Sequence, residues 1–308
     1  TTLGADNGIG AAAAMTVLES TDLEHGPIEA LFTIDEETGM TGANALEPGV
    51  LKGDILINTD SETEGELYVG CAGGIDTCGY FTPKFEEVPA GSKAFQLVVK
   101  GLKGGHSGMD IILGRANANK VMNELLAYAT EKLDARVADI QGGSLRNAIP
   151  RESFVTVTVP ENKAEELVAF VAEFEALVKE QFAAVEPEMS ITIVPAEMPA
   201  KVIDKQTIAN LIEAVAKYPN GVVAMSKDFE GTVETSSNLA IVKLIDGQIM
   251  TASLQRSLVD ASKDELAAEM RKLLESCGAK AESTGAYPGW KPNINSTIYN
   301  TMKKVYAD

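Results

Sequence analysis

Histidine and cysteine are both scarce in this chain of 308 residues. There are two histidines, His25 and His106, which limits the imidazole ligands that a metal site could draw from this sequence. The three cysteines, Cys71, Cys78 and Cys277, are odd in number and form no CxxC pair. This usage is typical of reduced thiols and predicts a cytoplasmic protein rather than a disulfide-stapled secreted domain.

Positive charge is also in short supply. Lysine and arginine total 26 against 45 aspartates and glutamates, which gives a net charge of −19. A surface of this sign repels phosphate backbones, so nucleic acid is excluded as a partner. No apolar run reaches the roughly 18 residues of a membrane span, and we expect no membrane partner either.

The first 62 residues alternate between helical and strand-like segments. A glycine- and alanine-rich helix, GAAAAMTVLES, precedes two apolar runs, EALFTID and DILINTDSE, that we predict as strands. This alternation predicts an α/β fold with a mostly parallel sheet. Both runs end in acidic clusters, at the end of the strand where ligands bind in such sheets.

After a glycine-rich segment, CAGGIDTCG, that we interpret as a turn region, the pattern changes to α+β. The order strand, helix, strand, strand, helix, strand is typical of a ferredoxin-like unit, and the predicted elements are 95–102, 114–132, 136–140, 153–159, 167–182 and 190–194. We predict capping boxes from Asn162 to Glu165 and from Ser262 to Glu265. Helices near 204–217 and 262–277 with strands near 222–226, 240–244 and 248–256 indicate a second, partly duplicated unit. A proline-glycine linker, 285–293, then precedes one more helix.

Carboxylates follow the two predicted strands at Glu36, Glu37 and Asp60, and Asp6 directly precedes the first glycine turn. Such residues commonly cap helices or face water. Adjacent glutamates in extended backbone point in opposite directions, however, so one could bind a cation while the other faces a water. That division suits metal-assisted hydrolysis. Spacing alone fits Mg²⁺ equally well, but a phosphotransfer protein would need a phosphate-binding loop, and none is present.

Longer motifs are more specific. The segments ADNGIG, TIDEETGMTGA and INTDSE, together with GLKGGHSGMDI and SLRNAIPRE, resemble the di-zinc peptidase family of the carboxypeptidase G/aminoacylase type. The likeness runs along essentially the whole chain and is strongest to the carnosinase-like members that cleave Xaa-His dipeptides. It implies part of a mostly parallel-sheet zinc-peptidase catalytic domain, with an inserted α+β lid domain that contains ferredoxin-like sandwich units. The implied boundaries are 1–74 (catalytic domain), 75–286 (lid and dimerisation domain) and 287–308 (second catalytic part).

The resemblance also implies a role for each carboxylate. Asp6 is similar to the aspartate that bridges two Zn²⁺ ions, and Glu37 and Asp60 to ligands of one ion each. Glu36 is similar to the general base that takes a proton from a zinc-bridged water. Co²⁺ or Mn²⁺ could replace Zn²⁺ at such a site.

In the lid, His106 of GGHSG is similar to a histidine that stabilises the tetrahedral oxyanion. Asn147 resembles a residue that contacts substrate, and Arg256 one that binds the carboxylate at the C-terminus of the substrate, a task for which its planar fork is suited. Without the resemblance, His106 would be an ordinary loop histidine and Arg256 a surface ion pair. His25 has neither context and is expected on the surface, and Ser107 lacks an adjacent base for serine hydrolysis.

The family pattern further requires histidine ligands that lie in an HxD motif and in a distal glycine-rich segment, and neither histidine here has that context. We therefore expect the chain to be an internal, inactive segment of a cytoplasmic homodimeric di-zinc dipeptidase. The alternatives are a tripeptidase or N-acyl-amino-acid hydrolase on the same scaffold, and, for the segment itself, a non-catalytic lid or dimerisation module.

Overall fold

The computed structural model describes residues 7–36, 40–60 and 65–307. Two compact units divide the chain: unit 1 comprises the residues up to Val69 together with those from Asn293, and unit 2 runs from Gly70 to Pro292. The helices described in unit 1 are α1 (Gly8–Glu19), α3 (Thr41–Asn44) and α8 (Thr297–Val305). Helices α1 and α8 confirm the predicted first and last helices.

The two apolar runs that we predicted as parallel strands have irregular backbone wherever the structure describes them. Their apolar side chains remain exposed: Phe32 is 55% and Leu56 78% accessible. A strand needs a hydrogen-bonded neighbour, and the described part of unit 1 contains none. The prediction of strands in these two segments is therefore wrong for this structure.

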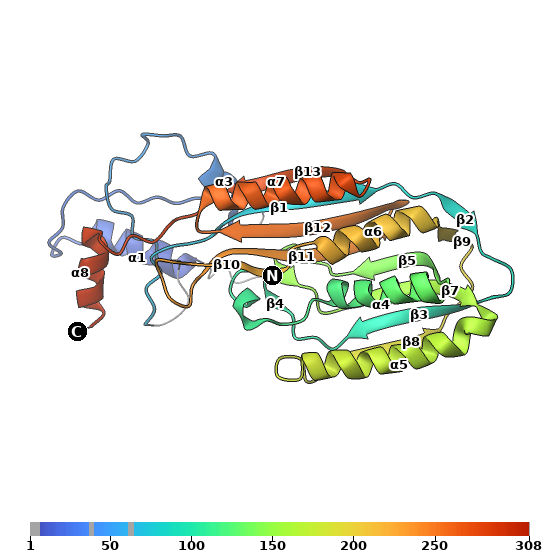
Figure 1. The fold of residues 1–308 in the computed structure, drawn as a ribbon. Coiled ribbons are helices and arrows are strands. Elements are labelled where there is room, and N and C mark those ends of the chain that lie inside the picture. Colours follow the sequence, from blue (N-terminus) through green and yellow to red (C-terminus); the bar gives the residue numbers. More distant parts are fainter. Residues whose placement is uncertain (1–6, 37–39, 61–64, 308) are drawn as a thin grey trace. The chain divides into compact units, whose positions relative to one another are not determined.

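Unit 2 is built on a nine-stranded sheet with helices on one face (Figure 1). The strands are β1 (Gly73–Phe81), β3 (Ser92–Lys100), β5 (Arg136–Gly142), β7 (Ser153–Pro160), β8 (Ser190–Pro195), β10 (Gly221–Met225), β11 (Val233–Ile245), β12 (Gln248–Ser257) and β13 (Lys280–Tyr287). The helices are α4 (Ala118–Lys132), α5 (Ala164–Gln181), α6 (Lys205–Lys217) and α7 (Asp260–Ser276). Short strands pair beside it: β2 (Phe85–Glu87) with β9 (Lys201–Ile203), and β4 (Gly105–His106) with β6 (Ala148–Ile149).

The sheet contains the same ferredoxin-like arrangement twice. In chain order the first repeat is β3-α4-β5-β7-α5-β8 and the second is β1-α6-β11-β12-α7-β13. The spatial orders are β8-β3-β7-β5 and β13-β1-β12-β11, so each repeat places its strands in the order fourth, first, third, second. The second strands of the two repeats, β5 and β11, pair antiparallel and make one continuous sheet. Both the ferredoxin-like unit and its partial duplicate are thus confirmed.

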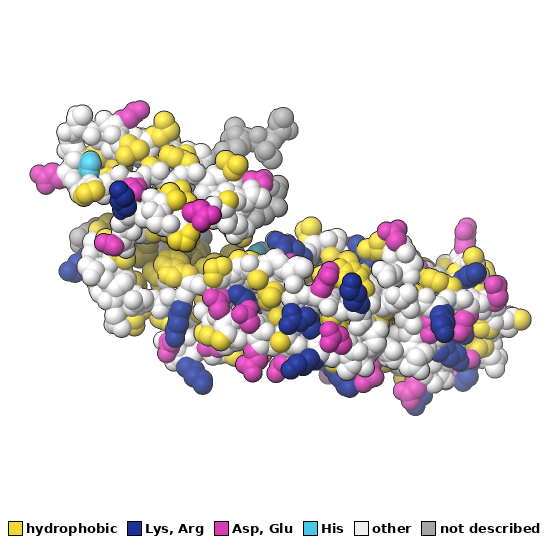
Figure 2. Space-filling model, turned by 90° about the horizontal axis from the view of Figure 1, so that it is seen from above, with side chains coloured by type: hydrophobic (Ala, Val, Ile, Leu, Met, Phe, Trp, Pro, Cys, Tyr) yellow, Lys and Arg dark blue, Asp and Glu magenta, His cyan; other side chains and the backbone are white. Residues whose placement is uncertain are grey.

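The core lies between the sheet and its four helices. Helix α5 buries Leu167, Val171 and Val178, as the three- and four-residue spacing of its apolar residues predicts, but Leu177 of the same pattern is 66% exposed. The opposite face of the sheet carries no helix among the described elements, and polar side chains such as Gln96 and Thr156 lie there, in register with each other. Over unit 2, acidic and basic side chains are interspersed on the face seen in Figure 2.

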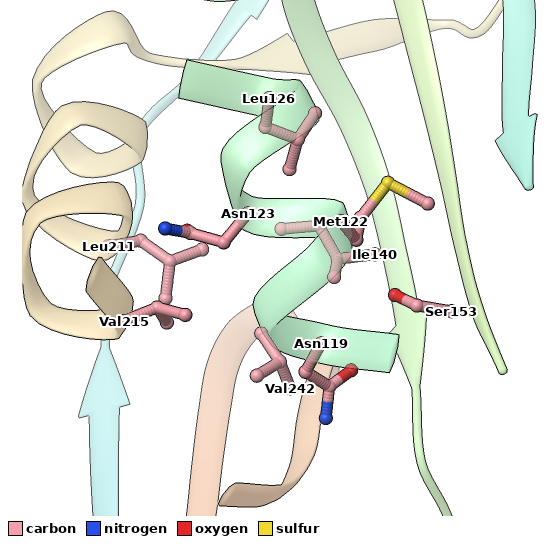
Figure 3. A pocket seen from close by; sticks show the side chains of 9 residues that line it. All are labelled: Asn119, Met122, Asn123, Leu126, Ile140, Ser153, Leu211, Val215 and Val242. Atoms are coloured by element: carbon pink, nitrogen blue, oxygen red, sulfur yellow. The ribbon is translucent and has the colours of Figure 1, made fainter. Parts of the chain in front are cut away.

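Polar side chains of α4 join the two repeats. Asn117 Nδ2 donates to Leu239 O and to Asn220 Oδ1, both at 2.9 Å, and Asn123 Nδ2 donates to Ile212 O at 3.1 Å. A cavity of about 10 Å³ lies at this seam, bordered by Asn119 and apolar side chains of α4, α6 and β11 (Figure 3). Its volume is that of about one water molecule, so no substrate fits there.

Two local predictions are corrected by the structure. The segment CAGGIDTCG, interpreted as a turn region, forms most of β1. Its glycines serve close packing: a Cβ on Gly79 would lie 2.7 Å from the Leu274 side chain of α7. Both capping boxes are wrong, because α5 begins after a 3-10 turn that contains Asn162 and α7 begins before Ser262; neither helix has a side-chain N-cap.

Candidate functional site

The carboxylates predicted for the metal site belong to unit 1. Asp6 and Glu37 lie outside the described residues. Glu36 is exposed, and its carbonyl accepts the Met40 N–H at 3.1 Å. Asp60 is also exposed, and its N–H donates to Asn58 Oδ1 at 2.9 Å.

The structure brings together the two loops that follow Asp6 and precede Asp60. Asn7 caps α1 by accepting the Gly10 N–H at 2.8 Å, and its Nδ2 donates to Thr59 O at 2.9 Å. A Cβ on Gly10 would lie 2.4 Å from the Thr59 hydroxyl, so this approach requires glycine. Asp35, directly before Glu36, has a left-handed φ of 64°, a conformation that is uncommon for residues other than glycine.

His106 lies in β4 of unit 2 with a defined ring state. Its Nδ1 accepts the N–H groups of Gly108 and Met109, each at 3.2 Å, so a neutral ring carries its proton on Nε2. Burial lowers the His106 pKa, the nearby Arg256 guanidinium lowers it further, and Asp110 opposes both. The ring is thereby kept as a neutral N–H donor.

Arg256 lies on β12, on the sheet face opposite the helices. Its Nη1 donates to the Tyr287 hydroxyl at 3.0 Å, and its Nε donates to Ser107 Oγ at 3.4 Å. Ser107 is 1% exposed, so its hydroxyl serves as an acceptor for Arg256 rather than as an accessible nucleophile. A Cβ on Gly108 would contact both the His106 ring and Arg256 Nε, at 3.1 and 3.4 Å, which places the two side chains beside one another.

Asn147 lies in an exposed loop that reaches the same place. Its carbonyl accepts the Ser107 N–H at 2.8 Å, which fixes the loop next to the GGHSG segment. The preceding residue, Arg146, pairs with Asp76 of β1, on the same sheet face as Arg256. The three predicted lid residues His106, Asn147 and Arg256 therefore converge at one end of the sheet, from segments that are 40 to 150 positions apart in the sequence.

Among residues 7–36, 40–60 and 65–307, no three His, Cys, Asp or Glu side chains gather closely enough to hold a metal ion. The described carboxylates alone thus do not make a complete metal site. A groove of about 400 Å³ between α4 and α6 contains none of the predicted site residues. No helix in the described part of the chain is long and apolar enough to cross a bilayer.

The chain is similar to a known peptidase domain and to two dipeptidases. Residues 97–186, which cover most of the first ferredoxin-like repeat, match the peptidase dimerisation domain of M20 peptidases. Over 306 residues, 99% of the chain, the sequence is 43% identical to the cytosol non-specific dipeptidase of Escherichia coli (strain K12). The structure superposes on that of the aminoacylhistidine dipeptidase from Vibrio alginolyticus with a TM-score of 0.91 and 46% identity, over 100% of this chain. The chain is thus a homologue of these dipeptidases, and it spans 63% of the length of each.

Sequence reasoning missed three residues of this cluster: Tyr287, Asp110 and Asp76. Asp110 accepts the His106 backbone N–H at 2.8 Å and lies 3.4 Å from Arg115. The spacing of Asp110, four residues after His106, was the sequence signal that could have identified it. Tyr287 and Asp76 reach the site only through strand pairing, for which the local sequence holds no signal.

Proposed function

We propose that the protein acts in metal-dependent hydrolysis of dipeptides, with Xaa-His (carnosine-like) dipeptides as the substrate class. The observation that supports this most is the convergence of His106, Asn147 and Arg256 in a homologue of two dipeptidases. In this proposal Arg256 binds the substrate carboxylate, Asn147 contacts the peptide, and the Nε2–H of His106 donates to the oxyanion that develops during attack.

The proposed metal ligands are Asp6, Glu37 and Asp60, with two Zn²⁺ or other divalent ions such as Co²⁺ or Mn²⁺. Bound metal would polarise the scissile carbonyl and acidify a water, and Glu36 would accept the proton of that water. The carboxylate donor set suits such cations. The left-handed backbone of Asp35 supports the assignment of Glu36 as the base, because strained backbone recurs beside functional residues.

The test is hydrolysis of β-alanyl-histidine by the metal-loaded full-length protein, measured together with bound metal. Glu36→Gln should lower kcat at least about a hundredfold with metal content unchanged, since a general base contributes about 10²–10⁴-fold. Asp6→Ala should lose metal as well as activity, and Glu47→Gln, an exposed control, should change neither. Equal activity of Glu36→Gln and wild type would refute the assignment of the base.

A substrate panel separates the alternatives. Preference for tripeptides or for N-acyl amino acids would identify a different hydrolase on the same scaffold, and absence of turnover with any of them would favour a lid or dimerisation module. The dimerisation domain in residues 97–186 supports a homodimer, which light scattering would report. The three free cysteines and the cytosolic location in the name of the Escherichia coli relative support a cytoplasmic protein, which cell fractionation would test.

A further inference from the structure

Tyr287 reaches Arg256 although their strands are not neighbours. Strand β1 lies between β12 and β13, and its Gly74 pairs with Arg256 on one side and with Tyr287 on the other. Adjacent strands are about 4.8 Å apart, so the two outer positions of this row are separated by about 10 Å. Only long side chains that lean toward each other above β1 can meet across that distance.

Gly74 makes this meeting possible. A Cβ at Gly74 would lie 2.4 Å from the Tyr287 hydroxyl oxygen and 2.5–2.6 Å from ring carbons, so the phenol lies directly over the glycine. Any other residue at this position would displace the ring. Gly74 in the interior of β1 therefore has a specific role: it lets the aromatic side chain of Tyr287 pack directly over the backbone of β1.

The guanidinium of Arg256 is held at two of its nitrogens by neutral acceptors. The Tyr287 hydroxyl accepts from Nη1 at 3.0 Å and Ser107 Oγ accepts from Nε at 3.4 Å. The described residues provide Arg256 with no carboxylate partner. A neutral hydroxyl holds the guanidinium of Arg256 in place without neutralising its charge. An acidic side chain would instead compete with an incoming carboxylate for the same N–H groups.

We propose that Tyr287 is a positioning residue for Arg256: with Gly74 beneath it, it orients the guanidinium so that the remaining N–H groups face a ligand carboxylate. The inference rests on the proposed function only in the identity of that ligand as the C-terminus of a dipeptide. A purely structural Tyr287 would cover Gly74 and support β13 through its ring, and Phe would do the same. The two roles therefore differ at one atom, the hydroxyl oxygen.

The first experiment reads Arg256 directly and needs no turnover. In the ¹⁵N-labelled protein, the Arg256 Nε–Hε signal is assigned by its loss in Arg256→Lys and its solvent exchange is measured. Tyr287→Phe and Gly74→Ala should each speed that exchange several-fold and weaken binding of acetate, the carboxylate probe, by about tenfold, the size of one charge-assisted hydrogen bond. Acetamide is the uncharged control ligand.

Tyr80→Phe is the matched variant. Tyr80 lies on the same face of β1 and donates to Glu282 at 3.1 Å, so its substitution removes a hydroxyl from the sheet without touching Arg256. It should leave both the exchange rate and acetate binding unchanged. Unaltered Arg256 exchange and acetate affinity in Tyr287→Phe would overturn the proposal.

The second experiment uses the metal-loaded full-length enzyme. Tyr287→Phe should raise KM for β-alanyl-histidine about tenfold with kcat within about twofold, and should not alter KM for the C-terminal amide of the same dipeptide. An equal rise in KM for both substrates would overturn the positioning role. If wild type hydrolyses neither, the proposed function fails, while the Arg256 exchange still decides the role of Tyr287.

Discussion

Lys120 of α4 donates from Nζ to the carbonyl oxygen of Val215 at 2.7 Å, and so caps the C-terminal end of α6 in the other repeat. The same ammonium reaches Ala216 O at 3.0 Å and Tyr218 O at 3.1 Å. Val215 and Ala216 lie in the last turn of α6, whose carbonyls lack the usual donors four residues later, and Tyr218 is the C-cap; a cation at this end is favoured by the helix dipole. One side chain thus ties the first repeat to the second.

Lys120→Met should lower the free energy of unfolding by about 1–3 kcal/mol, because it removes the ammonium donor from partly buried carbonyls at the end of α6. Lys217→Met is the control, since Lys217 pairs with Glu213 on the exposed face of α6 and its loss should cost far less stability. Urea denaturation of both variants provides the comparison. Equal losses would contradict the capping role.

The titration of His106 should respond in opposite directions to its two charged neighbours. Burial and Arg256 lower its pKa and Asp110 raises it. Arg256→Gln should therefore move the pKa upward, and Asp110→Asn downward, as followed by NMR of the ring carbons. Shifts of the same sign in both variants would contradict this arrangement.

The same shift has a consequence for stability. Because the folded-state pKa of His106 lies below the ordinary value of 6.5, the neutral ring favours folding and its contribution is fully present above pH 6.5. It declines as pH falls below 6.5 toward the folded-state pKa. The loss of unfolding free energy across this window should be smaller in His106→Gln than in wild type when measured by denaturation at several pH values.

Substitution of a residue that caps a helix in the structure should cost more stability than substitution of the capping residues that we predicted from the sequence. Asp204 caps α6 by accepting the Thr207 N–H at 2.9 Å, and it also accepts the Lys84 N–H at 2.8 Å. Asp204→Ala should cost about 1–2 kcal/mol, while Ser262→Ala and Asn162→Ala should cost less than about 0.5 kcal/mol. Thermal unfolding of the three variants tests this.

The Asp204 cap also has a pH signature. Burial raises its pKa, but hydrogen bonds from Thr207 and Lys84 outweigh this, and the net shift is downward. Its stabilisation is therefore present above the ordinary value of 3.8 and is lost as pH falls through the lowered folded-state pKa. The stability difference between wild type and Asp204→Ala should shrink in acid and stay constant near neutrality.

Two glycines with left-handed backbone should differ sharply on substitution. Gly143 has φ of 70° and a Cβ there would lie 1.8 Å from the Ala240 carbonyl oxygen, whereas Gly247 has φ of 78° and open space around it. Gly247→Ala should cost about 1 kcal/mol for backbone strain. Gly143→Ala should cost well over that, because backbone atoms of β11 must move. Chemical denaturation that ranks them equally would contradict the contact.

The sequence predicts elements whose signal is local. The spacing of Leu167, Val171 and Val178 identifies α5, and alternation around Leu97 and Val99 identifies β3, since each side chain buries the expected face. The glycines of β1 misled the prediction because their function is long-range: they admit Leu274 and Tyr287. The apolar residues around Phe32 also led to a wrong prediction of a strand, because a strand requires a hydrogen-bonded neighbouring strand as well.

For the candidate site, motif resemblance identified His106, Asn147 and Arg256, which the fold brings together. The supporting residues Tyr287 and Asp76 were beyond reach, because they arrive through pairing of β1 with strands about 180 and 210 positions later. Local sequence carries no register information of that range.

The nesting of one repeat within the other determines the order in which the chain can fold. All strands of the first repeat lie between residues 92 and 195, whereas β1 must wait for β12, which begins at Gln248. As the chain leaves the ribosome, β1 is therefore made early and remains unpaired while the inserted repeat closes through nearer contacts. The second repeat is completed last, on the edge that β5 of the first already offers to β11.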